Sequence, residues 1–403
     1  MTIAQLHVCT LGGLHHEMYF PDADSLLIQE MSRDSRGLLQ ANALFWAEHL
    51  QPSRVLALSR SLAESEGLAA SKAAYWAIAA NPKLFVEQVT EAARNVCDQA
   101  LSIRTFYRYV ETLQILCRLY SDLVYAPHRL TLEEGFTTIE KSSLVLFNTC
   151  LNPKANPYLS FIRERCLPVV EAVQPDIVWL NGRITISSMA LARLIKNIRP
   201  NAHITVVGHS SEYYSLNKIT QFLLKNDVLF SAIDSIILDD TEQSRDSLLE
   251  AVGTGTDLAN VPNMIFARRS SGGVTVSQTP FKRFTSKKSM VEQLRFRPST
   301  SRVPLRLPPS ALVNAKLFPD QACYWNKCMF CGINQKYHGA AVSGEHLEWD
   351  VRPALECFES LQQRGIQYVW AIDEAIPPQT LRSLSQGLLA QGNTVAWQAR
   401  SRF

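Results

Sequence analysis

The alternation of apolar and polar positions predicts an α/β chain. Between residues 158 and 252, short apolar segments typical of buried strands (DIVWLN, HITVVG and IDSIIL) are separated by longer ones. In the longer segments (LSFIRERCLPVVEAV, TISSMALARLIKNI and TEQSRDSLLEAV) apolar residues recur every three or four positions, as on one face of a helix. Strands that alternate with helices of this length form a parallel, doubly wound sheet. A further strand is predicted near the N-terminus in IAQLHVC.

Two other patterns bound this first unit. Helical periodicity over about residues 70–150 predicts a helical insert, and NMIFARRSSGGVTVS predicts a hairpin around Gly272 and Gly273. We therefore expect a Rossmann-like domain over residues 1–265. A hairpin and linker would follow over residues 266–315.

The strand–helix alternation then starts again. AKLFPDQAC, IQYVWAID and TVAWQAR are predicted strands, and HLEWDVRPALECFESLQQRG and PPQTLRSLSQGLLAQG are predicted helices between them. The glycine that closes the first of these helices is a usual C-terminal cap. Residues 316–403 thus predict the start of a second parallel α/β domain.

Composition narrows the class of protein. The 403 residues are 46% hydrophobic and 19% charged, which is ordinary for a globular protein, and the net charge of +3 is too small to indicate a nucleic-acid or membrane partner. The N-terminus lacks the basic and apolar regions of a signal peptide, and no apolar run has the length of a membrane span. These features predict a cytoplasmic protein without a membrane partner.

Residues 279–312 have a different composition. They contain only one acidic residue, Glu292, against eight basic ones: Lys282, Arg283, Lys287, Lys288, Arg295, Arg297, Arg302 and Arg306. A solvated linker between domains is the first interpretation of such a segment. Contact with nucleic acid is the alternative.

Three of the nine cysteines are clustered. Cys323, Cys328 and Cys331 lie in CYWNKCMFC with the spacing C-x4-C-x2-C, whereas the other six are scattered and are expected to be reduced, buried side chains. Clustered thiolates bind soft metals or iron–sulfur clusters. A structural zinc ion would need a fourth ligand, for which His338 is available. A cluster with three protein ligands leaves one iron open for chemistry.

The location of the motif favours the cluster. The cysteines follow a predicted strand at the start of a strand–helix series, and chemistry in parallel barrels lies in loops after strands. This arrangement resembles the radical S-adenosylmethionine (SAM) superfamily, whose usual spacing is C-x3-C-x2-C. CYWNKCMFCG is similar to the C-Y-W-G-K-C-x-F-C variant of a branch that carries a cobalamin-binding domain. That branch includes proteins that modify ribosomally made peptides.

The resemblance implies a set of cofactors and ligands. Cys323, Cys328 and Cys331 would hold a [4Fe-4S] cluster, whose open iron would chelate SAM. One electron would then split the sulfonium and give a 5′-deoxyadenosyl radical. The residues implied to bind SAM are Phe330, Asp373, Glu374 and Arg400. For the two acidic residues a solvated loop is the alternative interpretation, and for Arg400 an ordinary surface position.

The first domain resembles the Rossmann-like cobalamin domain of that branch. Cobalamin would be bound by loops that follow the predicted strands, at Thr10, Gly12, Asn181, Gly182, Gly208, His209, Ser210, Ser211, Asp240 and Glu242. None of the nine histidines has a glycine three positions later, so the D-x-H-x-x-G motif that supplies a lower axial ligand is missing. Cobalamin would thus bind without such a ligand. Alternatively, the domain has lost its cobalamin.

The resemblance predicts an enzyme that modifies a peptide or a small natural product, by methylation if cobalamin is present. It also implies an electron donor such as flavodoxin or ferredoxin. Residues 316–403 hold only about half of the strands and helices of a radical SAM barrel. The chain is therefore expected to be either a truncated product or one half of a split enzyme that a second chain completes, and slow turnover or none is expected of it alone. Two alternatives stay open: a catalytically incomplete accessory protein, and a zinc protein that binds RNA.

Overall fold

The computed structural model describes most of the two predicted units. The described residues are 3–9, 11, 36–70, 72–96, 101–132, 135–136, 143–181, 184–207, 228–237, 242–270, 273–280, 312–315, 317–318, 324, 349–363, 365–371, 373 and 375–401.

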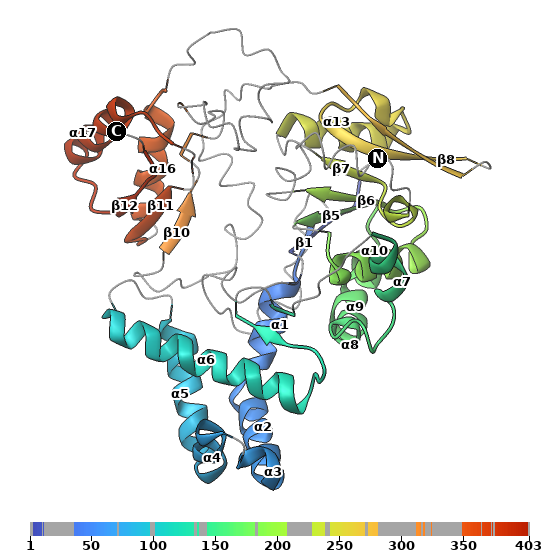
Figure 1. The fold of residues 1–403 in the computed structure, drawn as a ribbon. Coiled ribbons are helices and arrows are strands. Elements are labelled where there is room, and N and C mark those ends of the chain that lie inside the picture. The colour runs from blue at the N-terminus through green and yellow to red at the C-terminus, as the bar shows by residue number, and fades with distance from the viewer. Residues whose placement is uncertain are drawn as a thin grey trace.

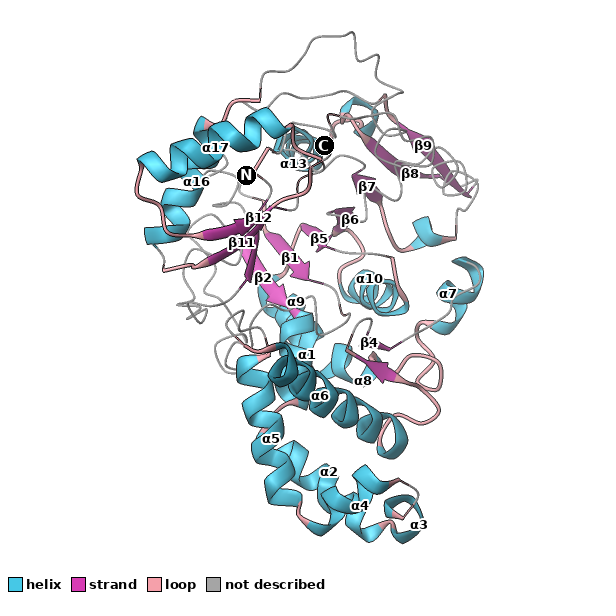
Figure 2. Ribbon diagram, turned by 60° about the vertical axis from the view of Figure 1, so that its left-hand side comes forward, coloured by secondary structure: helices cyan, strands magenta, loops and turns pink. Residues whose placement is uncertain are grey.

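A seven-stranded sheet forms the centre of the first unit (Figures 1 and 2). Its strands, in spatial order, are β2 (Arg36–Gln40), β1 (Gln5–Cys9), β5 (Ile177–Asn181), β6 (His203–Val207), β7 (Ser235–Ile237), β8 (Met264–Ser270) and β9 (Gly273–Gln278). The first five are parallel and the last two antiparallel. The order reverses at β1, as in doubly wound nucleotide-binding folds. The predicted α/β class and Rossmann-like sheet are confirmed.

Both faces of this sheet are buried. In β5, Val178 and Leu180 belong to one hydrophobic cluster, while Ile177 and Trp179 belong to another on the opposite face. The first cluster includes residues of α9 (Leu167–Val173) and α10 (Ile186–Ile198), and the second includes residues of α13 (Glu242–Thr254). Strands covered on both sides need apolar residues throughout, which explains the continuous apolar runs of the sequence.

The hairpin belongs to the sheet. β8 and β9 pair around the two predicted glycines, and β8 also pairs with β7. The sheet therefore continues to Gln278, beyond the boundary at residue 265 that the sequence predicts. β2 was not predicted.

A helical unit lies between β2 and β5 in the chain. It comprises α1 (Ala41–His49), α2 (Pro52–Glu64), α3 (Glu66–Ala69), α4 (Ala73–Ala80), α5 (Pro82–Asn95) and α6 (Ile103–Leu123). It begins at residue 41, so three helices (α1, α2 and α3) precede the predicted start of the insert at about residue 70. Short elements follow: β3 (Leu130–Thr131), β4 (Gly135–Phe136), α7 (Ser143–Thr149) and α8 (Leu159–Phe161). Two 3₁₀ turns, Leu229–Ser231 and Leu258–Asn260, lie near β7 and β8 in the sequence.

A π-helical turn interrupts the helix predicted in LSFIRERCLPVVEAV. It spans Ile162–Cys166, between α8 and α9. Arg165 of this turn pairs with the carboxylate of Glu48 in α1, which is almost fully buried and also pairs with Arg54 in α2. The ion pair between Arg165 and Glu48 thus connects the helical unit to the helices that cover the sheet. Such turns are rare and frequently occur at functional sites.

The second unit has the predicted order of strands and helices. β10 (Leu312–Ala315), β11 (Tyr368–Ala371) and β12 (Ala396–Gln398) form a parallel sheet in that order, connected through α16 (Arg352–Gln363) and α17 (Pro378–Ala390). β10 ends at Ala315, so the strand lies just before the predicted AKLFPDQAC rather than within it. A separate hydrophobic cluster stabilises this unit.

Within the described parts of the chain, no helix combines the length and the apolar character that crossing a bilayer requires.

Candidate functional site

The first candidate site is the edge of the seven-stranded sheet where the parallel strands end. Cys9, the last residue of β1, is in register with Gln40 of β2 and with Asn181 of β5, and Asn181 is in register with Val207 of β6. The segments that continue from these strands therefore start side by side. In open α/β sheets, ligands bind at this edge, where the strand order reverses. Here the reversal lies between β1 and β5.

The predicted cobalamin residues all follow strands that end at this edge. Asn181 is the last residue of β5 and Glu242 the first of α13, and only their backbones are described. Thr10, Gly12, Gly182, Gly208, His209, Ser210, Ser211 and Asp240 lie outside the described residues.

A small hollow lies beside the same edge. It has a volume of about 10 Å³ and is lined by Leu11, Ala41, Ile162, Cys166, Ser187, Ser188 and Leu191. Leu11 and Ala41 follow the ends of β1 and β2, Ser187 and Ser188 lie in the first turn of α10, and Ile162 and Cys166 belong to the π-helical turn. The side chains that line it are small or apolar, and all of them are buried. The sequence analysis did not find this group.

The start of α10 fixes one of the lining serines, Ser188. Thr185 and Ser188 form a capping box: the Thr185 hydroxyl accepts from the Ser188 N–H, and the Ser188 hydroxyl accepts from the Thr185 N–H over 2.7 Å. These bonds satisfy backbone donors that a helix start leaves unpaired. The TISS sequence carries this signal, and sequence reasoning could have used it to place the helix start.

Burial raises the pKa of the Cys166 thiol to about 12. A thiol in this state is a poor nucleophile and a poor metal ligand, because both roles need the thiolate. Cys117, Cys150 and Cys357 are also buried, as predicted for the scattered cysteines. Of the cysteines that the structure describes with side chains, all four are therefore packing residues.

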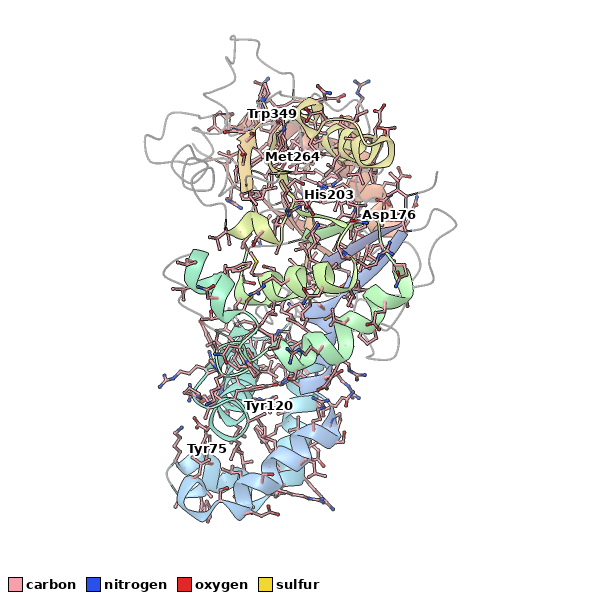
Figure 3. The ribbon with its side chains drawn as sticks, turned by 90° about the vertical axis from the view of Figure 1, so that its right-hand side faces the viewer. Tyr75, Tyr120, Asp176, His203, Met264 and Trp349 are labelled. Atoms are coloured by element: carbon pink, nitrogen blue, oxygen red, sulfur yellow. The ribbon has the colours of Figure 1, made fainter. Side chains whose placement is uncertain are left out.

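The opposite edge of the sheet carries a buried ionic network. The Asp234 carboxylate pairs with Arg269 and, over 2.8 Å, with Lys196, and it accepts the Ile204 N–H over 2.7 Å. Burial alone would raise the pKa of Asp234, but the two cations and the backbone bond outweigh it and lower the pKa. His203, at the start of β6, lies beside Asp176 (Figure 3), whose carbonyl accepts its backbone N–H over 2.8 Å, and it interacts electrostatically with Asp234. Ligands of such sheets bind at the other edge, so this network is structural.

The second candidate site is the edge where β10, β11 and β12 end. The N–H groups of Leu317 and Phe318, just after β10, donate to the two oxygens of Asp373, each over 2.6 Å. The Tyr324 N–H donates to the carbonyl of Ala375 over 3.2 Å, and the Ile376 N–H donates to the carbonyl of Arg400 over 3.0 Å. The three strands are thus connected to one another beyond their last paired residues.

These bonds place two of the predicted SAM ligands. Asp373 is 2% exposed, so the alternative of a solvated acidic loop is wrong for this residue. Arg400 lies after β12 with an exposed side chain. Cys323, Cys328, Cys331, Phe330 and Glu374 lie outside the described residues. Tyr324, between the first two cysteines, is described and is half-buried.

Comparisons with known proteins give a distant similarity in fold. No family model and no curated protein matches the chain. One similar solved structure is the radical S-adenosylmethionine methyltransferase TsrM from Kitasatospora setae with cobalamin and [4Fe-4S] cluster bound. It has 15% identity and a TM-score of 0.37, over 64% of this chain and 50% of that chain.

Another is the cobalamin-dependent S-adenosylmethionine radical enzyme OxsB with aqua-cobalamin and S-adenosylmethionine bound. It has 14% identity and a TM-score of 0.38, over 63% of this chain and 35% of that chain. The matched part of the chain thus spans half of the first structure and about a third of the second.

Proposed function

We propose that this chain is a radical SAM protein that binds a [4Fe-4S] cluster through Cys323, Cys328 and Cys331. One observation carries the proposal. The three-cysteine motif follows β10, the first strand of a parallel sheet, and Tyr324 within the motif is bonded to Ala375, just beyond the end of β11. The motif therefore starts at the edge where parallel α/β units carry their chemistry.

The donor set fits such a cluster. Thiolates are the usual ligands of iron–sulfur clusters, and three of them leave one iron for a small molecule. When bound, the cluster supplies one electron to SAM and so starts radical chemistry. Glu374 and Arg400, which lie beyond β11 and β12, are proposed to bind the amino group and the carboxylate of SAM. Asp373 is a third proposed contact, by the resemblance.

We also propose cobalamin at the edge of the seven-stranded sheet. The proposal is supported by the reversal of strand order between β1 and β5, because ligands of open α/β sheets bind at the edge where the order reverses. Binding would involve the segments that contain Thr10, Asn181 and Gly208. If cobalamin binds, methyl transfer to a carbon of a peptide or natural product is the reaction that we propose.

Anaerobic reconstitution tests the function directly. The parent chain, Cys328→Ser and Cys117→Ala are incubated with iron and sulfide, and bound iron, labile sulfide, zinc and cobalt are measured. We expect about four irons per parent chain, because a cubane cluster holds that number. Cys328→Ser should lose the iron and the brown colour, whereas Cys117→Ala, which removes a buried thiol of α6, should keep both.

Two outcomes would contradict the proposal. Stoichiometric zinc without sulfide would indicate a structural Cys3His site instead. Iron binding that survives Cys328→Ser would show that the motif is not the ligand set.

Cobalamin binding is tested separately, by titration with hydroxocobalamin. We expect a shift of its visible spectrum without a histidine ligand. The absence of binding at tens of micromolar would leave the first unit as a scaffold.

A further inference from the structure

The side chain of Asp373, two residues after the end of β11, binds the segment that follows β10. Both oxygens of Asp373 accept a backbone N–H, one from Leu317 and one from Phe318. The side chains of Leu317 and Phe318 are buried in the hydrophobic cluster of the second unit. The two residues are therefore anchored twice, by their apolar side chains and by their amides.

The chemistry of this contact is specific to a carboxylate. An ionised carboxylate offers acceptors only, so its two oxygens match two N–H donors. A carboxamide in the same place would turn its own NH₂ group toward one of these donors. Hydrogen bonds that involve an ionised group are also shorter and about twice as strong as neutral ones. The 2% exposure of Asp373 removes competition from water.

A second bond continues the connection into the cysteine motif. Tyr324, which directly follows Cys323 in the sequence, donates its N–H to Ala375, two residues after Asp373. The chain between Leu317 and Tyr324 is thus fastened at both ends to residues 373–375. The eight residues from Leu317 to Tyr324 include the first cysteine, Cys323.

We propose that Asp373 is a positioning residue for the cysteine motif: its carboxylate fixes the first residues after β10 and so limits the direction in which the chain enters the motif. This inference deepens the proposed function and rests on it. In this role the Asp373 carboxylate binds the backbone N–H groups of Leu317 and Phe318. The role is therefore independent of the predicted contact between Asp373 and SAM.

Asp350 provides a matched control. Its carboxylate also accepts a backbone N–H, that of Arg352, and pairs with the Arg352 guanidinium. It lies before α16 and is partly exposed, and the bonds of its carboxylate are made within its own segment, to Arg352. Asp350→Asn therefore makes the same chemical change as Asp373→Asn without touching the bonds that involve the cysteine motif.

The first test uses the full chain with iron. Asp373→Asn, Asp373→Glu and Asp350→Asn are reconstituted in parallel, and bound iron and the electron paramagnetic resonance spectrum of the dithionite-reduced protein are measured. We expect Asp373→Asn to retain less than half of the parent's iron, with shifted g values. Asp373→Glu should recover part of both, and Asp350→Asn should match the parent. A folded Asp373→Asn protein with the parent's iron content and spectrum would overturn the proposal.

The second test needs no iron, so it separates this inference from the proposed function. In the metal-free chain, alkylation of Cys323, Cys328 and Cys331 by iodoacetamide is followed by mass spectrometry, with buried Cys357 as internal reference. Asp373→Asn should speed alkylation of the three cysteines by about tenfold, because fewer bonds restrain the segment. If the parent binds no iron, the proposed function fails while this test still decides on Asp373.

Hydrogen exchange of the parent chain covers the case in which Asp373→Asn does not fold. The amides of Leu317 and Phe318 should exchange at least about tenfold more slowly than unprotected amides. Exchange at the unprotected rate would show that the carboxylate does not hold them and would overturn the proposal.

Discussion

At the residue scale, burial keeps two histidines uncharged. The His49 Nδ1–H donates to the carbonyl of Phe45 over 2.7 Å, and the Tyr125 hydroxyl donates to Nε2 over 2.5 Å. His203 Nε2 is hydrogen-bonded to the Ser235 hydroxyl. That hydroxyl in turn donates a hydrogen bond to the Thr205 hydroxyl. Loss of solvation lowers the pKa of each histidine to about 4. A second proton on either ring would break one of these hydrogen bonds or leave a charge buried in the protein.

These shifts predict a loss of stability in mild acid. A histidine whose folded pKa lies below its unfolded value binds protons more readily in the unfolded chain. Its contribution is therefore complete above the unfolded value of 6.5 and is lost as the pH falls toward about 4. Each histidine should account for roughly 3 kcal/mol at most, since one pKa unit corresponds to about 1.4 kcal/mol. Urea unfolding of the first unit between pH 7 and pH 4 measures the change.

Substitution of a single histidine tests whether that residue causes the loss of stability in acid. His49→Gln should reduce the dependence of the unfolding free energy on pH, and His128→Gln, which changes a half-buried histidine bonded to the Lys154 carbonyl, serves as the control. A free energy that stays constant from pH 7 to pH 4 would contradict the prediction.

At the scale of elements, α16 shows how one glycine ends a helix. Gly365 has a φ of +76°. Its N–H donates to the carbonyl of Gln362, and the Ile366 N–H donates to that of Leu361. This pair of bonds is a Schellman motif, and Leu361 and Ile366 meet in the same hydrophobic cluster, as the motif requires. The chain is thereby turned from the helix into β11.

Substitution of Gly365 should rank residues by their tolerance of the left-handed conformation. Gly365→Ala should lower the unfolding free energy of the second unit by about 1 kcal/mol, because a Cβ is unfavourable at this φ. Gly365→Asn should lower it less, since asparagine adopts this conformation more readily. Thermal unfolding measures both. No neighbouring atom lies within 4 Å of an added Cβ, so a clash would not explain the loss.

Equal stability of the Ala and Asn variants would be evidence against this backbone explanation.

At the scale of the whole molecule, the hydrophobic residues fall into separate cores. The cluster that stabilises the second unit runs from Leu317 to Val395, and none of its residues belongs to the two clusters on the faces of the seven-stranded sheet. A unit with its own core can unfold cooperatively by itself. We therefore expect two transitions in the calorimetric unfolding of the chain.

A matched pair of leucines tests this expectation. Leu62 in α2 and Leu384 in α17 are both fully buried, one in each core. Truncation of a buried leucine to alanine costs about 2–5 kcal/mol. Leu62→Ala should lower the midpoint of one transition, and Leu384→Ala that of the other. If either variant shifts both transitions by the same amount, the two cores unfold as one unit and the prediction fails.

Much of the fold could be predicted from the sequence because its signals are local. Apolar runs and helical periodicity depend on residues within a few positions of each other, so β5, β6, α10, α13, β11, α17 and β12 were predicted close to their observed bounds. β10 overlaps its predicted segment only at Ala315. β2 was missed because RGLLQ is too short to show a period. The π-helical turn was missed because it changes the helix by a single residue, which the apolar pattern tolerates.

The sequence by itself determined the alternation of strands and helices, the hairpin around Gly272 and Gly273, and the three thiols of the cysteine motif. Only the tertiary structure decided the strand order, with its reversal at β1, and the partners of Asp373, which lie 55 and 56 residues away in the chain. The physical reason is the range of the interactions. Periodicity reports the environment of neighbouring residues, whereas strand pairing and the burial of a carboxylate depend on groups that only folding brings together.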